Sequence, residues 1–356
     1  MRVTLFRPFQ DPYRLSMQLY ADRLEEALRP LLPNGSVRSF HPRPAFVSPR
    51  LLRYAGPYLL YPLQARRAQA DLGHIADHAY GHLLYFLDPS RSVVTVHDTI
   101  LWKEGGLSKP VRALILRGIS RAAAVICDSH ATRDALLALI HLPPKRMEVI
   151  PLGVDHRFFE PAEGSPRERL KIPPGRYLLH VGHNKPYKNI PGLLRLLSLL
   201  SKERWPDLRL LRVGTRLTPE QERLAAELQV SDRIVQLGLV GPEELPSVYR
   251  CAELLLFPSL DEGFGLPVLE AMASGLPVVA SNRGALPEVV GKAGILVDPS
   301  DLAGAARQVE RLLAEPGLRR ELRDAGRERA CGFTWEKTAA STLEIYRRIL
   351  RGALPS

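Results

Sequence analysis

Short runs of apolar residues alternate with longer stretches of helical periodicity along the whole chain. Most of these runs are continuous stretches of valine, isoleucine and leucine, which is typical of parallel strands covered on both faces. The pattern predicts strands at Val3–Phe6, Val93–Val96 and Ala123–Cys127 in the first half, and at Tyr177–Val181, Leu208–Val213, Ile234–Leu237, Leu254–Phe257, Pro277–Ala280 and Ile295–Val297 in the second. Strands that alternate with helices in this way indicate an α/β fold.

The 356-residue chain is long for one hydrophobic core, and prolines, glycines and charges gather between its two groups of strands. We predict an amino-terminal domain over residues 1–160, a linker over 161–176, a second domain over 177–332, and a final helix over 333–356 that packs back toward the first domain. Both domains would be doubly wound and Rossmann-like, and they would face each other across a cleft. In such sheets ligands bind beyond the carboxyl ends of the strands.

The last stretch, TWEKTAASTLEIYRRILRG, has the periodicity of an amphipathic helix. Thr334 is the expected N-cap, because its hydroxyl can accept a hydrogen bond from a free amide of the first turn. Leu343, Tyr346 and Leu350 follow one another at helical spacing, which predicts that they form the buried face.

Positive charge is concentrated in the first half of the chain. Of the net charge of +11, residues 1–150 contribute +8 (20 Lys and Arg against 12 Asp and Glu) and the remainder +3 (29 against 26). The stretch from Ala27 to Ala70, here called the basic segment, contains seven arginines and no acid. Its arginines are interleaved with Tyr54, Tyr58 and Tyr61. A solvated helix face and a contact with an anionic membrane both remain open. No RNA- or DNA-binding module is recognisable, so nucleic acid is not expected.

The composition, with 45% hydrophobic and 24% charged residues, is that of a globular protein and excludes a disordered one. Cys127, Cys251 and Cys331 are far apart and match no metal-binding spacing, so we expect reduced core residues of a cytosolic protein. The sequence contains no run of about 18 apolar residues, so no transmembrane helix is expected. The first residues have the pattern of a strand and not of a signal peptide.

The most informative stretch is DEGFGLPVLEAMASG, Asp261–Gly275. It follows a predicted strand, and its glycines favour a tight turn that a ligand can approach closely. Pro267 suits the first position of a helix, which would end at the last serine with the final glycine as its left-handed cap. The free amides of Gly265 and Leu266, together with the positive end of the helix dipole, would then form a phosphate site.

Glu262 and Glu270 stand on opposite sides of this turn, with Gly263 and Phe264 between them. In the predicted helix Glu270 lies about one turn from the start and points back toward it. If the turn held a diphosphate, one carboxylate could accept hydrogen bonds from a ribose and the other from a hexose. The alternatives are two ordinary surface acids and the acid–base pair of a glycosidase.

The two glutamates, separated by seven residues, resemble the signature of glycosyltransferase family 4, the retaining enzymes with the GT-B fold. The resemblance extends over most of the chain, and its blocks occur in the family's order. The other blocks are VVTVHD (93–98), AAVICDSHATRDALL (123–137), EVIPLGVDHRFF (148–159), YLLHVGHNKPYKN (177–189) and SNRGALPEVVGKAGILVDPSD (281–301). The VHD and HNKPYKN stretches look most like bacterial mannosyl- and related hexosyltransferases of surface polysaccharide or glycolipid synthesis.

The resemblance implies that residues 1–160 form an acceptor-binding domain and residues 177–332 a nucleotide-sugar-binding domain. For the donor, it implies that Glu270 binds the ribose and that Glu262 orients the sugar. Lys188 follows a predicted strand and could neutralise a departing diphosphate. In the family an arginine often accompanies this lysine, but here His183 follows Gly182 in its place, and Lys185 is a candidate substitute. The resemblance also implies that residues near Val240 lie beside the base.

His97 ends the predicted strand VVTVH, at the edge that faces the expected cleft. A histidine in such a place is often a core or turn residue, but the resemblance implies that it contacts the donor sugar near the reacting carbon. The next residue, Asp98, is predicted to orient the turn.

The stretch HIADHAYGH places His74, His78 and His82 at intervals of four residues. On a helix they would share one face, as in some zinc sites. The stretch begins like a strand, however, and no further ligand is distinctive nearby, so no metal is expected. We predict instead that Asp77, His78, Tyr80 and His82 line the acceptor side of the cleft.

The sequence thus predicts a retaining hexosyltransferase that moves a hexose, with mannose as the best guess, from a nucleotide-diphosphate sugar to a glycan or lipid-linked acceptor. GDP-mannose is preferred over a UDP-hexose as the donor, and no cofactor is expected. The enzyme would be cytoplasmic and able to lie at the inner face of the membrane. The alternatives are another GT-B sugar-nucleotide enzyme, such as an epimerase or a phosphorylase, and a non-catalytic protein that binds membrane or nucleic acid and does not need the glutamates.

Overall fold

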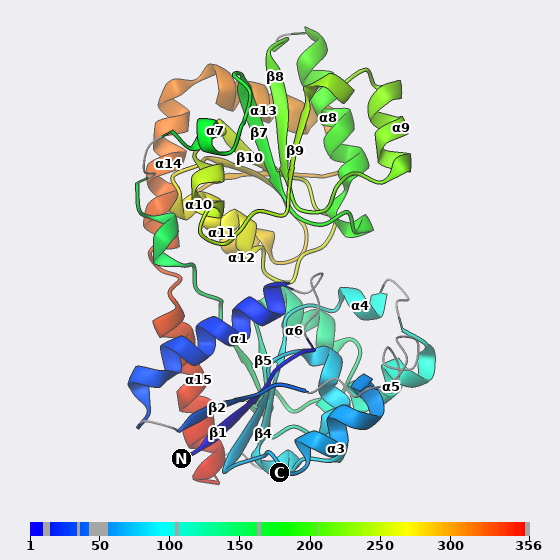
Figure 1. Ribbon diagram of the computed structural model, residues 1–356, viewed down its shortest axis with the longest axis vertical. Helices are drawn as coiled ribbons and strands as arrows, with labels where there is room; N and C mark the ends of the chain where they lie inside the picture. The colour runs from blue at the N-terminus through cyan, green and yellow to red at the C-terminus, as the bar shows by residue number, and fades with distance from the viewer. Residues whose placement is uncertain are drawn as a thin grey trace. The chain divides into compact units, whose positions relative to one another are not determined.

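A computed structural model describes residues 1–9, 15–33, 36–42, 56–103, 107–161, 165–203 and 205–352. The chain divides into two compact units, unit 1 (Met1–Gly153 with Thr334–Ser356) and unit 2 (Val154–Phe333) (Figure 1). The final helix is thus grouped with unit 1. Residues 154–176, which the sequence assigned to the end of the first domain and to a linker, are grouped with unit 2.

Unit 1 is built on a parallel sheet with the strand order β2-β1-β3-β4-β5-β6 in the described residues. Its strands are β1 (Val3–Phe6), β2 (Val37–Phe40), β3 (Leu72–Ile75), β4 (Ser92–Val96), β5 (Ala124–Cys127) and β6 (Met147–Val149). Its helices are α1 (Leu15–Leu28), α3 (Tyr61–Ala65), α4 (Ile100–Lys103), α5 (Lys109–Ile119), α6 (His130–Leu137) and α15 (Trp335–Leu350), with short turns η1 (Arg29–Leu31), η2 (Gly56–Leu60), η3 (His78–Tyr85), η4 (Pro89–Arg91) and η5 (Pro144–Arg146).

The apolar pattern predicted β1, β4 and β5 but missed β2, β3 and β6. In β3, Gly73 and His74 interrupt the apolar run, although the strand is completely buried. His74 is accommodated because both ring nitrogens have partners: Nδ1 lies 2.5 Å from the Tyr346 hydroxyl and Nε2 lies 2.8 Å from Thr95 Oγ1. Burial lowers the pKa of His74 to about 3, so the ring is neutral.

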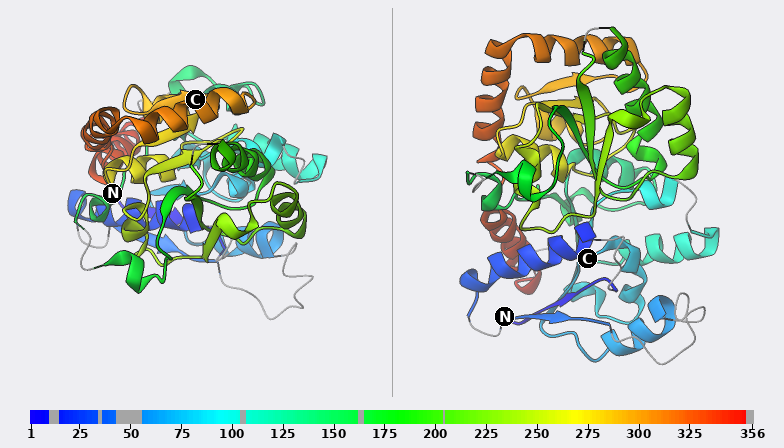
Figure 2. Two further views of the ribbon diagram at one scale, coloured as in Figure 1. Left: turned by 90° about the horizontal axis from the view of Figure 1, so that it is seen from above. Right: turned by 45° about the horizontal axis from the view of Figure 1, so that its top comes forward.

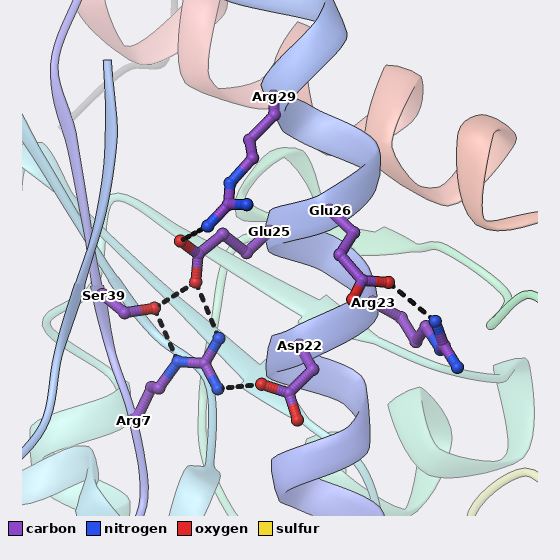
Figure 3. A network of polar contacts seen from close by, with 7 residues as sticks. All are labelled: Arg7, Asp22, Arg23, Glu25, Glu26, Arg29 and Ser39. Atoms are coloured by element: carbon purple, nitrogen blue, oxygen red, sulfur yellow. Dashed lines mark hydrogen bonds and ion pairs between the residues drawn. The ribbon is translucent and has the colours of Figure 1, made fainter. Parts of the chain in front are cut away.

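A network of charges centred on the buried pair Arg7 and Glu25 ties α1 to β1 and β2 (Figure 3). Arg7 donates from Nε to Ser39 Oγ (2.6 Å) and from Nη2 to Glu25 Oε2 (2.7 Å), and its Nη1 bonds Asp22. Arg29 donates to the other oxygen of Glu25 at 2.9 Å. Burial alone would raise the pKa of Glu25, but the hydrogen bonds that it accepts outweigh burial and hold the pKa below its ordinary value. The helix is therefore held to the carboxyl end of β1 by paired charges.

Helix α15 packs against α1 within unit 1, where the red and blue helices of Figure 1 lie side by side. Thr334 caps it as predicted, because its hydroxyl accepts a hydrogen bond from the Lys337 amide at 3.2 Å. Tyr346 and Leu343 are buried as predicted, but the prediction for Leu350 is wrong. Its side chain is 38% exposed, since Ile349, one position earlier on the helix, occupies the buried face.

Unit 2 is a second parallel sheet, with the described strand order β12-β11-β10-β7-β8-β9. Its strands are β7 (Arg176–Val181), β8 (Leu208–Val213), β9 (Ile234–Gly238), β10 (Leu254–Phe257), β11 (Val278–Ser281) and β12 (Ile295–Val297). Its helices are α7 (Pro166–Arg169), α8 (Ile190–Glu203), α9 (Pro219–Glu227), α10 (Leu245–Tyr249), α11 (Leu266–Ala273), α12 (Leu286–Val290), α13 (Leu302–Ala314) and α14 (Pro316–Ala330), with turns η6 (His156–Phe158), η7 (Pro186–Lys188) and η8 (Ser231–Arg233). All the strands predicted for this half are confirmed within one residue at each end.

An apolar core fixes the sheet of unit 2, and with it the positions at which the loops after the strands begin. Helices α8 and α13 pack side by side on one face of the sheet (Figure 2). Leu193 and Leu197 of α8, together with Val309 and Leu312 of α13, join Leu210 of β8 in one buried apolar cluster. The strand order reverses between β7 and β10, because β8 and β9 lie on one side of β7 and the later strands on the other. Such a reversal opens a crevice at the carboxyl ends of the two strands.

The structure qualifies three other predictions. Cys127 and Cys251 are buried, but Cys331 is exposed at the end of α14 and is not a core residue. Tyr61 of the basic segment is buried, with its hydroxyl donating to the Arg7 carbonyl at 2.6 Å. Arg43, Arg50, Arg53 and Tyr54 of this segment lie outside the described residues. None of the helices in the described ranges is long and apolar enough to cross a membrane.

Candidate functional site

The predicted donor residues gather at the point in unit 2 where the strand order reverses. β7 and β10 are parallel neighbours, with Leu178 opposite Leu254, so the loops that follow them start side by side. The Leu260 amide donates to the Tyr187 carbonyl at 2.6 Å, which ties the two loops together. Asn189 adds a bond from Nδ2 to the Pro258 carbonyl at 3.1 Å. The position of the site therefore follows from the order of the strands.

Lys188 and Glu262 form a buried ion pair across these two loops. The Nζ of Lys188 lies 2.6 Å from Oε1 of Glu262, and the two side chains are 8% and 9% exposed. The ammonium also lies 4.7 Å from the centre of the Phe257 ring, within the range of a cation–π contact. The sequence placed both residues at the donor but gave no sign that they touch. Their burial excludes the alternative that Glu262 is an ordinary surface acid.

The turn between the glutamates has the predicted shape. Gly265 has φ of +102°, a conformation in which other residues are strained, and a Cβ at this position would displace Leu286 Cδ2, 2.7 Å away. Helix α11 begins at Leu266, so Pro267 is its second residue and not its first. Within the described residues, the amides of Gly265 and Leu266 donate no hydrogen bond. They are available to a phosphate at the start of the helix.

Glu270 is a buried carboxyl held by a tyrosine. Its Oε2 accepts a hydrogen bond from the Tyr249 hydroxyl at 2.6 Å, and its side chain has no cationic partner in the described residues. Burial raises the pKa of Glu270 from 4.5 to about 7; the Tyr249 bond acts against this increase, and the charge of Asp155 adds to it. The residue is 8% exposed, so it is not an ordinary surface acid either.

The loop after β11 supports Glu262 from behind. The Ala285 amide donates to the Glu262 carbonyl at 3.0 Å. Gly284 has φ of +56°, and a Cβ there would lie 2.6 Å from both the nitrogen and the oxygen of the Glu262 backbone. Only glycine allows this close approach. The sequence block that contains Gly284 had been noted, but the glycine had not been connected with Glu262.

His97 lies in unit 1, directly after β4, and its ring is fully engaged within that unit. Nδ1 is 2.7 Å from Asp128 Oδ2 and Nε2 is 2.8 Å from the Ala76 carbonyl oxygen. Both partners are acceptors, so the ring is suited to the doubly protonated form. Burial alone would lower the pKa of His97, but the Asp128 carboxylate outweighs it and raises the pKa to about 9. Asp98 orients the turn as predicted, since its Oδ1 accepts from the Ile100 amide at 2.9 Å.

The chain was compared with known families and proteins. Residues 17–158 match the family model described as Glycosyltransferase Family 4, and residues 165–329 match the one described as Glycosyl transferases group 1. The O-antigen chain mannosyltransferase B of Escherichia coli is 31% identical over 302 residues, which cover 81% of this chain and 78% of that protein. The chain belongs to glycosyltransferase family 4.

Further similar proteins extend the comparison. The MMP alpha-(1->4)-mannosyltransferase of Mycolicibacterium hassiacum is 39% identical over 228 residues, covering 62% of this chain and 53% of that protein. This chain thus matches little more than half the length of several curated relatives. The crystal structure of HepE from Anabaena, in complex with UDP and glucose, has a TM-score of 0.77 and 19% identity, covering 97% of this chain and 100% of that one. The predicted GT-B fold class is confirmed.

The remaining donor positions predicted from the family 4 resemblance lie along the ends of β7 and β9. Gly182 follows β7, and His183 is half-buried beside it, whereas Lys185 is exposed. Val240 follows β9 and is half-buried. Contacts of these residues with a donor stay predictions.

The four residues predicted for the acceptor side belong to the interior of unit 1. Asp77 caps η3 by accepting from the Ala79 amide at 2.8 Å, and His82 Nε2 lies 2.8 Å from the Pro57 carbonyl oxygen. The remaining two, His78 and Tyr80, are also buried, at 3% and 7% exposure. Their contact with an acceptor stays a prediction.

The three histidines of this stretch do not share a helix face. His74 lies on β3, whereas His78 and His82 belong to η3. Among the described residues, no group of three or more histidine, cysteine or acidic side chains could hold a metal ion.

Asp128, the partner of His97, and Tyr249, the partner of Glu270, were not predicted from the sequence. Asp128 follows β5, the neighbour of β4, so the rule that parallel strands end at one edge would have placed it beside His97. Tyr249 ends α10, and no local signal connects it with Glu270. The first could have been predicted from the topology, and the second could not.

Proposed function

We propose that this chain is a retaining hexosyltransferase that takes a sugar from a nucleotide-diphosphate donor and adds it to a glycan or lipid-linked acceptor. One observation carries the proposal: two buried glutamates, Glu262 and Glu270, flank a helix start with free amides, and Lys188 lies against the first of them. Paired carboxylates suit sugar hydroxyls, and the lysine and amides suit a diphosphate. Membership in family 4 supports the same assignment.

In this proposal unit 2 holds the donor. Glu270 accepts hydrogen bonds from the ribose, and Glu262 accepts them from the hexose. The amides of Gly265 and Leu266, together with Lys188, bind the phosphates. The nucleotide base lies near Val240. The acceptor is assigned to unit 1, together with a contact of His97 with the sugar.

During transfer the bond between the anomeric carbon and the phosphate oxygen breaks, and the acceptor hydroxyl bonds to the same carbon. Positive charge develops on that carbon and negative charge on the departing diphosphate. Lys188 and the fixed amides stabilise the negative charge. Attack from the side of the leaving group retains the anomeric configuration, and the departing phosphate takes the acceptor proton.

The donor sugar is assigned by analogy with relatives. The similarity to two mannosyltransferases supports mannose, and GDP-mannose is our preferred donor. HepE was crystallised with UDP and glucose, which makes a UDP-hexose the alternative. The acceptor belongs to polysaccharide or glycolipid synthesis. Because side chains and amides can offset the charge of the diphosphate, we expect transfer to continue in the presence of a chelator.

A weak contact with the inner face of an anionic membrane is part of the proposal. Leu59 and Leu63 expose 59% and 53% of their surfaces one helical turn apart, and Arg66 and Arg67 follow them, also exposed. Exposed leucines beside arginines suit an interface of acyl chains and anionic headgroups. The site of action would be cytoplasmic. Binding to vesicles with and without anionic lipid tests this part separately.

A thermal-shift panel of GDP, UDP, ADP and their common sugars, with and without a chelator, tests the donor site. A ligand at 100 times its dissociation constant stabilises a protein by about 2.7 kcal/mol, which moves the melting temperature by several degrees. We expect one nucleotide series to act, with no effect of the chelator. The shift should vanish in Glu270→Ala and persist in Glu222→Ala, a change of an exposed glutamate in the same unit. No shift with any nucleotide would contradict the proposal.

Transfer assays separate the rival functions. The proposed enzyme needs a sugar acceptor and should lose at least a hundredfold of its activity in Glu262→Gln, by analogy with the loss of one catalytic stabilising group. Turnover without an acceptor would indicate an epimerase, and dependence on free phosphate a phosphorylase. A protein that binds membranes but shows no turnover, and that is indifferent to Glu262→Gln, would be the non-catalytic alternative.

A further inference from the structure

Arg212 is a buried cation without an acid. It lies on β8, is 1% exposed, and stands opposite His180 on β7 and Gln236 on β9. Its guanidinium donates to two neutral oxygens, the Thr215 carbonyl and Oδ1 of Asn184, and its Nε has no partner in the described residues. No carboxylate within these ranges pairs with it.

Burial of the charged Arg212 guanidinium costs free energy unless another group compensates the charge. Moving a cation out of water without a counter-ion is unfavourable, and proteins usually place an acid beside it. Burial lowers the pKa of Arg212 to about 10, so the guanidinium still carries its charge at neutral pH. Both oxygens that accept from the guanidinium are neutral, so its positive charge is uncompensated within the described residues.

The neighbouring ionisable residues Lys188 and His180 do not supply a counter-charge for Arg212. Lys188 is neutralised by Glu262, at 2.6 Å. His180 is completely buried, and both its ring nitrogens lack partners in the part of the chain that is described. Burial, followed by the charges of Arg212 and Lys188, holds the pKa of His180 well below its ordinary value. The ring is thus neutral and exposed to the field of both cations.

Arg212 also fixes the loop that follows β7. Asn184, which the guanidinium holds, donates from its backbone amide to Thr215 Oγ1 at 2.9 Å and from Nδ2 to the Arg216 carbonyl. At the start of the same loop, a Cβ on Gly182 would lie 3.4 Å from Cε of Lys188 and 3.5 Å from Cε1 of His180. The loop therefore rests on Arg212, His180 and Lys188.

We propose that Arg212 is a positioning residue for the donor diphosphate, which it favours by its uncompensated charge beneath the loop Gly182–Lys188 and by holding Asn184 in place. It acts through the loop and not by contact with the phosphates. The inference rests on the proposed function, since it concerns the same donor site.

The test compares binding of a nucleoside diphosphate with binding of its nucleoside. Calorimetry with GDP and guanosine, and with UDP and uridine if the uridine series binds, is done on the full chain and four variants. Arg212→Gln removes the charge and can still donate to Asn184. Arg212→Lys keeps the charge, and Asn184→Ala removes the link. Arg209→Met, on the same strand but at its other end beside Gly175, is the matched control.

We expect Arg212→Gln to weaken the diphosphate about tenfold or more and the nucleoside less than about twofold, whereas Arg212→Lys stays within about threefold of the original protein. Such a tenfold change corresponds to about 1.4 kcal/mol. Asn184→Ala should show a smaller loss, again confined to the diphosphate, and Arg209→Met should show none. The dependence of diphosphate affinity on salt should weaken in Arg212→Gln alone, because one cation has been removed.

Equal losses for nucleoside and diphosphate in Arg212→Gln would mean a merely structural role, and unchanged affinities would overturn the inference while leaving the proposed function intact. If the original protein binds no nucleoside diphosphate, both the inference about Arg212 and the proposed function are contradicted. If Arg212→Gln does not fold, Arg212→Lys and Asn184→Ala decide by the same comparison. A loss of diphosphate affinity in Arg212→Lys as large as that in Asn184→Ala would then contradict a role for the charge.

Discussion

Lys188 and Glu262, 74 residues apart in the sequence, meet as a buried ion pair with 2.6 Å between Nζ and Oε1. Each charge compensates the other. In the proposed function, a diphosphate that enters this site competes with Glu262 for the ammonium of Lys188, and a hexose hydroxyl then takes the place of the ammonium on the carboxylate. The pair therefore keeps the two proposed donor-binding groups in position, and each charge has a partner.

The first prediction concerns the coupling of this pair. Lys188→Met and Glu262→Gln should each lower the free energy of unfolding by about 3 kcal/mol, because each leaves a buried charge unpaired. The double variant should recover most of that loss, since no charge remains. Urea unfolding measures all three. Strictly additive costs in the double variant would show that the two groups do not interact. Transfer activity should be lost in every case.

The second prediction concerns the pH dependence of donor binding. Burial raises the pKa of Glu270 to about 7, and the ionised carboxylate is the better acceptor for ribose hydroxyls. Affinity for the nucleoside diphosphate should therefore increase from pH 6 to pH 8, with a midpoint near 7. In Tyr249→Phe the midpoint should move upward, because the bond that lowers the pKa is gone. Calorimetry from pH 6 to pH 8 measures the midpoint of this change in affinity. Glu270→Gln is the control and should show no midpoint.

The same carboxyl makes a third prediction, for stability. Because the pKa of Glu270 is higher in the folded protein than its ordinary 4.5, the native state binds the proton more tightly. Its contribution is fully present below pH 4.5 and is lost as the pH rises to 7, by roughly 3 kcal/mol in all. Compared with Glu270→Gln, the original protein should lose stability over this window. Parallel curves of the free energy of unfolding against pH for the two proteins would contradict this prediction.

The fourth prediction concerns His97 and Asp128. The pKa of His97 is raised to about 9, so its contribution to stability is present below pH 6.5 and is lost as the pH rises to 9. Asp128→Asn should reduce this slope and cost about 3 kcal/mol at pH 6, because it leaves the imidazolium without its partner. Thermal unfolding at pH 6 and pH 9 measures both effects. An unchanged slope in Asp128→Asn would show that the pair does not control the titration of His97.

The fifth prediction concerns Gly284, which supports Glu262. Gly284→Ala adds a Cβ 2.6 Å from the Glu262 backbone at a φ of +56°, so the backbone of Glu262 must shift. We expect a loss of at least about 1 kcal/mol of stability and a fall in kcat that exceeds the change in nucleotide affinity. Gly317→Ala is the matched control, since a Cβ there meets nothing within 4 Å. Equal activity of the two variants would contradict the supporting role.

Much of unit 2 could be predicted from the sequence because its signals are local. Continuous apolar runs marked the strands, and Pro267 with its neighbouring glycines marked the turn and the start of α11. The rule that parallel strands end at one edge then placed the glutamates and Lys188 at a common site. In unit 1, β2, β3 and β6 were missed because polar residues or glycine interrupt the apolar run of each short strand. β3, for instance, is completed by its pairing with β1 and β4 and by the partners of His74.

The sequence by itself determined the parallel α/β architecture and the turn between Glu262 and Glu270, because these depend on residues a few positions apart. Only the tertiary structure decided which groups meet: Lys188 with Glu262, Tyr249 with Glu270, and Asp128 with His97. It also left Arg212 without an acid. The physical reason is that such pairings, and the pKa values that follow from them, depend on strand order and on how completely water is removed. Both are set by the packing of the whole domain and not by any local stretch of chain.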